Sequence, residues 1–307
     1  MRLGSGNYHK RTDMHQSTEE LSAKFQVPGL RFESGRGGLT KATLETSVSV
    51  GEIYLHGAHV TGFQLNGQKP LLWMSKQSLF QQGKAIRGGV PICFPWFGPH
   101  PLDPQAPGHG WARIRPWDVT AACPSDDGGL SIELQTKTEE FTLTYTAAFG
   151  RTMELTLKVE LSPQAPAPVR FEEALHTYFS ISDISDSLVE GLEGAAYIDK
   201  VDGSKRKPAA GRPIRFSGEC DRVYLDTMEP CLLRDPGNRR SIVVSKSNSK
   251  STVVWNPWIA KSARMADFGD NEWPEMVCIE AANVGPHSIE LAPGQSHQMG
   301  VQISLAT

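Results

Sequence analysis

Residues 87–113 bring together side chains that could bind a charged sugar. The segment contains RGGVPICFPWFG at positions 87–98 and HGWAR at positions 109–113. Glycine and proline are too frequent here for a regular element, so we expect loops, where binding residues are common. Arg87 and Arg113 could hold an anion through their planar sets of donors. The alternative is a buried turn in which both arginines pair with carboxylates.

Aromatic residues in the same segment offer flat apolar faces. Phe94, Trp96 and Phe97 are of the kind on which a sugar ring can lie. With the two arginines and His109, they indicate a pocket for a charged carbohydrate.

Two further segments contain candidates for proton transfer. Residues 171–179 (FEEALHTYF) are predicted to form a strand, in which alternation places His176 on the more polar face. A lone histidine there is usually a surface or a satisfied core residue. Residues 276–284 (MVCIEAANV) also predict a strand, and Glu280 shares a face with Met276, Cys278, Ala282 and Val284. Poor solvation raises the pKa of such a carboxyl, and a buried acid without a partner is a candidate site residue.

A histidine and a carboxylate that face one pocket can move two protons at once. One group removes the proton from the C1 hydroxyl of a sugar while the other protonates the ring oxygen, which opens the ring and allows closure to either anomer. The reaction needs no cofactor, and both groups are suitable near neutral pH. Asp221, before an apolar strand start, is either a turn former or an acceptor for a sugar hydroxyl.

Alternation of apolar and polar residues sets the fold class. It runs through residues 130–134, 141–147, 153–161 and 299–305, which is typical of half-buried antiparallel strands. Short helices are expected at 18–25 and 259–266, and a long loop over the site at 99–110. We therefore expect an all-β sandwich with a single domain over residues 17–307 and a flexible tail over residues 1–16.

Composition excludes several classes of function. The 307 residues carry a formal net charge of −3, which argues against a general nucleic-acid surface, and no apolar run is long enough to span a membrane. The five cysteines form no CxxC pair, so we expect reduced thiols in a cytoplasmic protein without a structural zinc site. His56 and His59 are three positions apart on a predicted strand and cannot share a metal ion. No cofactor or metal is expected.

The motifs together resemble one family. RGGVPICFPWFGP, HGWAR, ALHTYF, GLEGAAYIDK, CDRVY, NPWIAKSARMADF and EMVCIEAANV resemble the glucose-6-phosphate 1-epimerases, or hexose-6-phosphate mutarotases, of the aldose 1-epimerase superfamily. The resemblance runs from about Val27 to the C-terminus. It implies a galactose-mutarotase-like antiparallel β-supersandwich that acts as a monomer, without metal or nucleotide, on a hexose 6-phosphate.

The resemblance also implies roles for individual residues. His176 would be the general acid and Glu280 the general base, while Arg87 and Arg113 would bind the phosphate. Asp221 would hold a sugar hydroxyl, and His109 would line the sugar site.

Two positions depart from the family pattern. Gly108 stands where family members often carry Gln or Ser, so one substrate contact is missing or comes from elsewhere. Trp111 stands where Phe is more usual, which would change the pocket wall. Two alternative functions stay open at this point, a mutarotase of unphosphorylated aldoses and a non-catalytic module that binds sugar phosphates.

Overall fold

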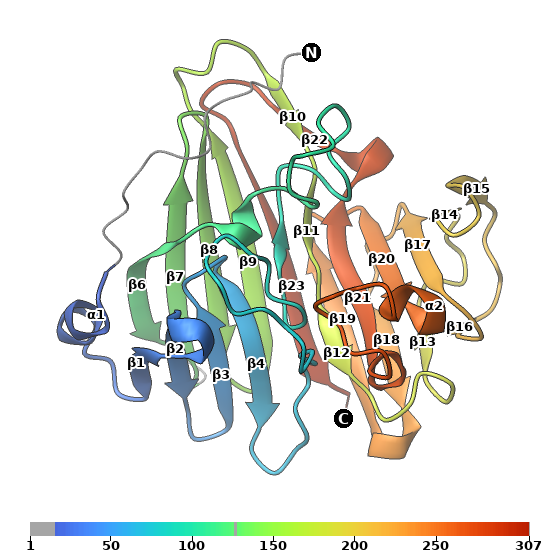
Figure 1. The fold of residues 1–307 in the computed structure, drawn as a ribbon, viewed down its shortest axis with the longest axis horizontal. Coiled ribbons are helices and arrows are strands. Elements are labelled where there is room, and N and C mark those ends of the chain that lie inside the picture. The colour runs from blue at the N-terminus through green and yellow to red at the C-terminus, as the bar shows by residue number, and fades with distance from the viewer. Residues whose placement is uncertain (1–15, 126–127, 307) are drawn as a thin grey trace.

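The structure is a computed structural model that describes residues 16–125 and 128–306. Within these residues the chain folds mainly into antiparallel sheets that lie in two layers (Figure 1). A nine-stranded sheet forms one layer. A four-stranded sheet and an eight-stranded sheet lie over different parts of it and form the other. The predicted all-β class is confirmed.

The strands are bounded as follows. The four-stranded sheet contains, in order, β1 (Leu30–Ser34), β2 (Thr40–Glu45), β3 (Ser49–Tyr54) and β4 (His59–Leu65). The nine-stranded sheet contains, in order, β16 (Ile214–Arg215), β13 (Leu188–Glu190), β18 (Cys231–Asp235), β19 (Arg240–Ser247), β23 (Ser296–Leu305), β9 (Met153–Leu161), β8 (Phe141–Phe149), β7 (Leu130–Lys137) and β6 (Asp118–Pro124). The eight-stranded sheet contains, in order, β15 (Lys205–Lys207), β14 (Tyr197–Asp199), β17 (Cys220–Leu225), β20 (Ser251–Asn256), β21 (Met276–Asn283), β11 (Glu173–Leu175) and β5 (Ile92–Cys93), with β12 (Tyr178–Ser180) also paired to β21. A separate pair joins β10 (Val169–Phe171) to β22 (Ile289–Leu291).

The helices are short. They are α1 (Thr18–Lys24) and α2 (Trp258–Ser262), with 3₁₀ turns η1 (Arg36–Gly38), η2 (Ala112–Ile114), η3 (Pro236–Asn238), η4 (Trp273–Glu275) and η5 (Gly285–His287). A capping box starts α1, because the Ser17 hydroxyl accepts from the Glu20 backbone N–H and the Glu20 carboxylate accepts from the Ser17 N–H. No helix among residues 16–125 and 128–306 is long and apolar enough to cross a membrane.

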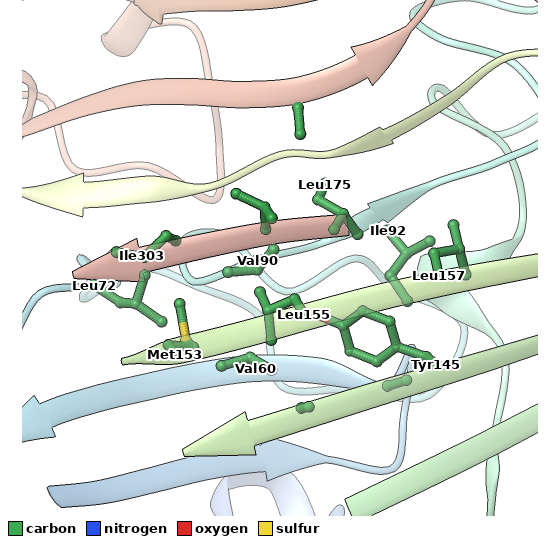
Figure 2. Close-up of a cluster of buried hydrophobic side chains, with 14 of the residues drawn as sticks. Val60, Leu72, Val90, Ile92, Tyr145, Met153, Leu155, Leu157, Leu175 and Ile303 are labelled. Atoms are coloured by element: carbon green, nitrogen blue, oxygen red, sulfur yellow. The ribbon is translucent and has the colours of Figure 1, made fainter. Parts of the chain in front are cut away.

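The predicted strands follow the alternation closely. In β8 and β9, every second side chain is buried and the residues between them are partly exposed or exposed. The buried rows meet residues of the other layer in one core, part of which Figure 2 shows with Val60, Ile92, Leu155 and Ile303. Full burial of one such aliphatic side chain contributes about 1.5–3 kcal/mol. The predicted tail at residues 1–16 lies outside the described residues except for Gln16, whose side chain accepts from the Val119 N–H.

The middle of the eight-stranded sheet, at β20 and β21, is buried on both faces, and this positions the site. All eight residues of β21 are buried. Val277, Ile279 and Ala281 belong to the core between the layers, whereas Cys278 and Ala282 pack into small clusters on the opposite face. Strand alternation therefore points Glu280 to the face away from the main core.

The predicted strand at 171–179 is divided, which corrects the sequence prediction. It forms the end of β10, then β11 and β12, with an interruption at His176 and Thr177. The His176 N–H donates to the Pro91 carbonyl (3.1 Å), and the Tyr178 N–H donates to the Gly89 carbonyl (2.9 Å). These bonds tie the interruption to the arginine-containing loop, and they place His176 at the site.

Candidate active site

Glu280 is a buried carboxylate without a hydrogen-bond partner in the described part of the chain. It is 1% exposed, and neither of its oxygens is paired. Burial raises the pKa of this carboxyl well above its ordinary value of 4.5, and the negative charge of Asp221 raises it further. Such a carboxyl holds a proton more readily than an exposed one, which suits a proton acceptor.

His176 lies beside Glu280. Its Nε2 is 3.4 Å from Oε1 of Glu280, and its ring stacks on Tyr178 with centroids 4.7 Å apart and planes 10° apart. The edge of Trp255 also contacts the ring. Burial lowers the pKa of His176 well below 6.5, and the positive charges of Arg87 and Arg113 add to this effect. The environment therefore moves the pKa values of the two groups toward one another.

Arg87 is paired with a carboxylate. Its guanidinium donates to both oxygens of Asp267, with the ion pair at 3.1 Å, and to the Tyr178 hydroxyl at 2.8 Å. The alternative of pairing with a carboxylate thus holds for this arginine. Because Tyr178 stacks on His176, Arg87 is connected to the proposed acid through one ring.

Arg113 is different, since no carboxylate in residues 16–125 and 128–306 lies within ion-pair distance of it. Its Nη2 donates to the Gly108 carbonyl at 2.7 Å, while Nε is buried and without a partner. Burial lowers the pKa of this guanidinium. A buried, uncompensated cation favours a bound anion at this place.

His109 and Asp221 also lie at the site. Nδ1 of His109 accepts from the Gly98 N–H at 3.2 Å, and its ring centroid is 5.7 Å from that of His176. Asp221 lies inside β17 opposite Trp255, so the turn-former alternative is wrong. Its carboxylate is 3.4 Å from Nζ of Lys261 and only partly exposed.

Three of the aromatic residues considered in the sequence are buried among core residues. Phe94 is fully buried, with ring centroids 5.3 Å from Trp111 and 5.1 Å from Phe141, so its faces are covered by core residues. Trp96 is 6% exposed, and its indole N–H donates to the Pro107 carbonyl. Trp111 likewise belongs to the core. The ring that does lie against site residues is Phe97, which contacts His109 edge-on.

Three residues at the site were missed in the sequence. Tyr178, Lys200 and Asp267 all lie within motifs that carry the family resemblance, but nothing local distinguishes them from structural residues. Their significance comes from contacts with residues distant in sequence, such as the pair formed by Arg87 and Asp267, 180 positions apart.

One group of side chains could hold a metal ion. His176, Cys278 and Glu280 offer ligand atoms within 4.8 Å of one another, the only such group of His, Cys, Asp or Glu in the described ranges. Histidine, thiolate and carboxylate are ligands that zinc accepts. A metal there would occupy both proton-carrying groups, so it would compete with proton transfer.

Comparison with known proteins identifies the family. Residues 41–304 match the family model described as Aldose 1-epimerase. The chain belongs to the aldose 1-epimerase family.

Relatives within this family are similar over most of their length. A protein of Cenchrus ciliaris named "Putative glucose-6-phosphate 1-epimerase" is 34% identical over 283 residues, which cover 87% of this chain and 85% of the relative. A protein of Escherichia coli with the same name is 36% identical and covers 74% and 78% of the two chains. The crystal structure of a "putative mutarotase" from Salmonella typhimurium superposes with a TM-score of 0.83 at 29% identity, covering 91% of this chain and 94% of that one. The expected mutarotase-like fold and the expected enzyme class, an epimerase that interconverts sugar anomers, are confirmed.

Proposed function

We propose that this aldose 1-epimerase interconverts the α and β anomers of glucose 6-phosphate and related hexose 6-phosphates. One observation carries the proposal: a buried histidine and a buried, unpaired carboxylate lie side by side, 3.4 Å apart. A non-catalytic binding module needs arginines and aromatic rings but has no use for such a pair.

The pair supplies the two proton transfers. Glu280 as carboxylate takes the proton of the C1 hydroxyl, and protonated His176 gives a proton to the ring oxygen. The electrons of the O–H bond form the C1 carbonyl as the C1–O5 bond breaks. Rotation about the C1–C2 bond then presents the other carbonyl face, and ring closure returns both protons to their donors. In this proposal Asp221 accepts a hydrogen bond from a sugar hydroxyl, and His109 lines the sugar site.

The phosphate preference rests mainly on Arg113. Its charge has no carboxylate partner in the described part of the chain, so a phosphate is a suitable counter-ion. Binding energy at the phosphate, remote from C1, can then orient the reacting end of the sugar.

A second candidate function is epimerisation of unphosphorylated aldoses. It is favoured by the ion pair between Arg87 and Asp267, which already neutralises one of the two arginines. The two candidates separate in one experiment, namely anomer exchange measured on glucose 6-phosphate and on glucose at equal concentrations. We expect kcat/KM to be at least about 100-fold higher for glucose 6-phosphate than for glucose. Two charged contacts of about 1.5 kcal/mol each correspond to a ratio of this size. Equal values would favour the second candidate.

A further inference from the structure

The hairpin of β14 and β15 places a lysine next to the site. Lys200 directly follows β14, and its backbone N–H donates to the Asp221 carbonyl at 2.8 Å. Its Nζ lies 4.5 Å from the centroid of the Phe97 ring. This cation–π contact holds the ammonium group against a ring that itself contacts His109.

Lys200 differs from the other lysines of this hairpin. Lys205 pairs with Asp202 at 2.9 Å, and Lys207 pairs with Asp199 at 2.8 Å. No carboxylate in residues 16–125 and 128–306 lies within ion-pair distance of Lys200. Its charge is therefore uncompensated, as is that of Arg113.

Two glycines bring these uncompensated charges to one place. A Cβ at Gly98 would lie 4.0 Å from Nζ of Lys200, with no other neighbour as close in the described residues. A Cβ at Gly108 would lie 3.9 Å from the Gly98 carbonyl oxygen and 4.0 Å from Nη2 of Arg113. Gly98 thus lies next to Lys200 and Gly108 lies next to both Gly98 and Arg113, and because glycine has no side chain, the space beside both residues is left open.

The count of charges fits a phosphate monoester. Asp267 neutralises Arg87, which leaves Arg113 and Lys200 as the two uncompensated cations of the site. A phosphate monoester carries a charge of about −1.5 to −2 at pH 7. Burial is the largest cause that lowers the pKa of His109 and of His176, and the charges of Arg113 and Lys200 lower both further, as expected for two cations close to the same rings.

We propose that Lys200 is a third phosphate-binding residue, which closes the anion site across Gly98 and Gly108 from Arg113. The proposal rests on the proposed function and deepens it.

The test compares Lys200→Met with Lys205→Met. The control removes the same charge from the same hairpin, but from a lysine that is paired and 70% exposed. Two quantities are measured: the Kd of inorganic phosphate by calorimetry, and kcat/KM for glucose 6-phosphate and for glucose. Loss of a charged hydrogen bond should weaken phosphate binding and lower kcat/KM for glucose 6-phosphate by about 10- to 100-fold in Lys200→Met. Activity on glucose should change less than about twofold, Lys200→Arg should recover most of the loss, and the control should behave as wild type.

Each contrary outcome has a definite meaning. Wild-type phosphate affinity and activity in Lys200→Met would overturn the role of Lys200 while leaving the proposed function intact. An equal loss on both sugars would overturn it as well, because Lys200 would then contact the sugar ring. If wild-type protein neither binds phosphate nor prefers the phosphorylated sugar, the proposed substrate fails, and the role of Lys200 fails with it.

Discussion

Nε2 of His176 lies 3.4 Å from Oε1 of Glu280, inside a site where both side chains are almost completely buried. The distance is slightly longer than a typical hydrogen bond, and neither Glu280 oxygen has a partner in the described part of the chain. A carboxyl left in this way is destabilising unless a ligand supplies the missing hydrogen bonds. We infer that the hydroxyl at C1 of the sugar supplies one of them.

The first prediction concerns the pH dependence of activity. The proposed reaction needs one proton on the pair, which must be on His176 at the moment of transfer, so activity is lost in alkali when the pair loses that proton. Burial lowers the pKa of His176 most, and the charges of Arg87 and Arg113 lower it further, so a bound phosphate that offsets these charges should raise it. The kcat profile on glucose 6-phosphate reports the enzyme–substrate complex, and the kcat/KM profile reports the free enzyme. The alkaline limb of kcat should therefore lie at higher pH than the alkaline limb of kcat/KM. Pairs of pH–rate profiles measure this, and coincident limbs would contradict it.

The second prediction concerns stability. The pKa of Glu280 is raised in the folded protein, so above pH 4.5 the native state binds more protons than the unfolded state. The free energy of unfolding therefore falls as pH rises through this range. Glu280→Gln removes this effect, so its Tm should exceed that of wild type at pH 8, with a gap that shrinks as pH falls toward 4.5. Thermal melts of both proteins across this pH range measure the gap, and a gap independent of pH would show that Glu280 ionises freely.

The third prediction separates the two arginines. Arg113→Ala removes a cation that has no carboxylate partner among the described residues, so kcat/KM on glucose 6-phosphate should fall by about 10- to 100-fold while activity on glucose changes little. Arg87→Ala also leaves Asp267 and the Tyr178 hydroxyl without their donor, and Tyr178 stacks on His176. Activity on both sugars should then fall. Steady-state rates on the two sugars test this, and equal losses on both sugars in Arg113→Ala would make that arginine a ring-binding or scaffold residue.

The fourth prediction concerns the backbone conformation of the loop that contains Gly108 and Gly110, and it compares alanine substitutions at these two glycines. Gly110 has φ of 77°, and a Cβ there would lie 1.9 Å from the Phe94 carbonyl oxygen. Gly110→Ala should cost at least about 1–2 kcal/mol from the left-handed backbone alone, with the steric clash in addition. Gly108 has no such strain and its nearest neighbour would be 3.9 Å away, so Gly108→Ala should stay within about 0.5 kcal/mol of wild type. Denaturant unfolding measures the free energy of unfolding of both variants, and similar losses in the two would contradict this loop geometry.

Local patterns were sufficient for much of the fold and for the proton-transfer pair. The alternation at 153–161 predicted β9 because one face of that strand packs in the core and the other does not. Glu280 was identifiable because a carboxylate interrupts an apolar row on a strand face, and no distant contact is needed to recognise that.

What the sequence did not reveal depends on long-range contacts. The interruption of the strand at His176 arises from hydrogen bonds to the loop at residues 89–91, and Phe94 is buried because strands from elsewhere supply its neighbours. The partner of Arg87 lies 180 positions away, and Lys200 reaches Phe97 from a different hairpin. Residue type indicates which of these side chains could bind a ligand, but only the folded chain shows which are already paired.

Exchange NMR on equilibrated glucose 6-phosphate tests the central claim most directly, because it reports transfer between the α and β anomeric signals without any coupling enzyme. The wild-type protein should accelerate this exchange. Glu280→Gln, which keeps the volume but cannot accept the proton, should lower the rate by about 10²–10⁴-fold while still melting cooperatively. His176→Asn should do the same through loss of the acid. Near-normal exchange in a folded Glu280→Gln protein would show that a different group takes the proton from C1.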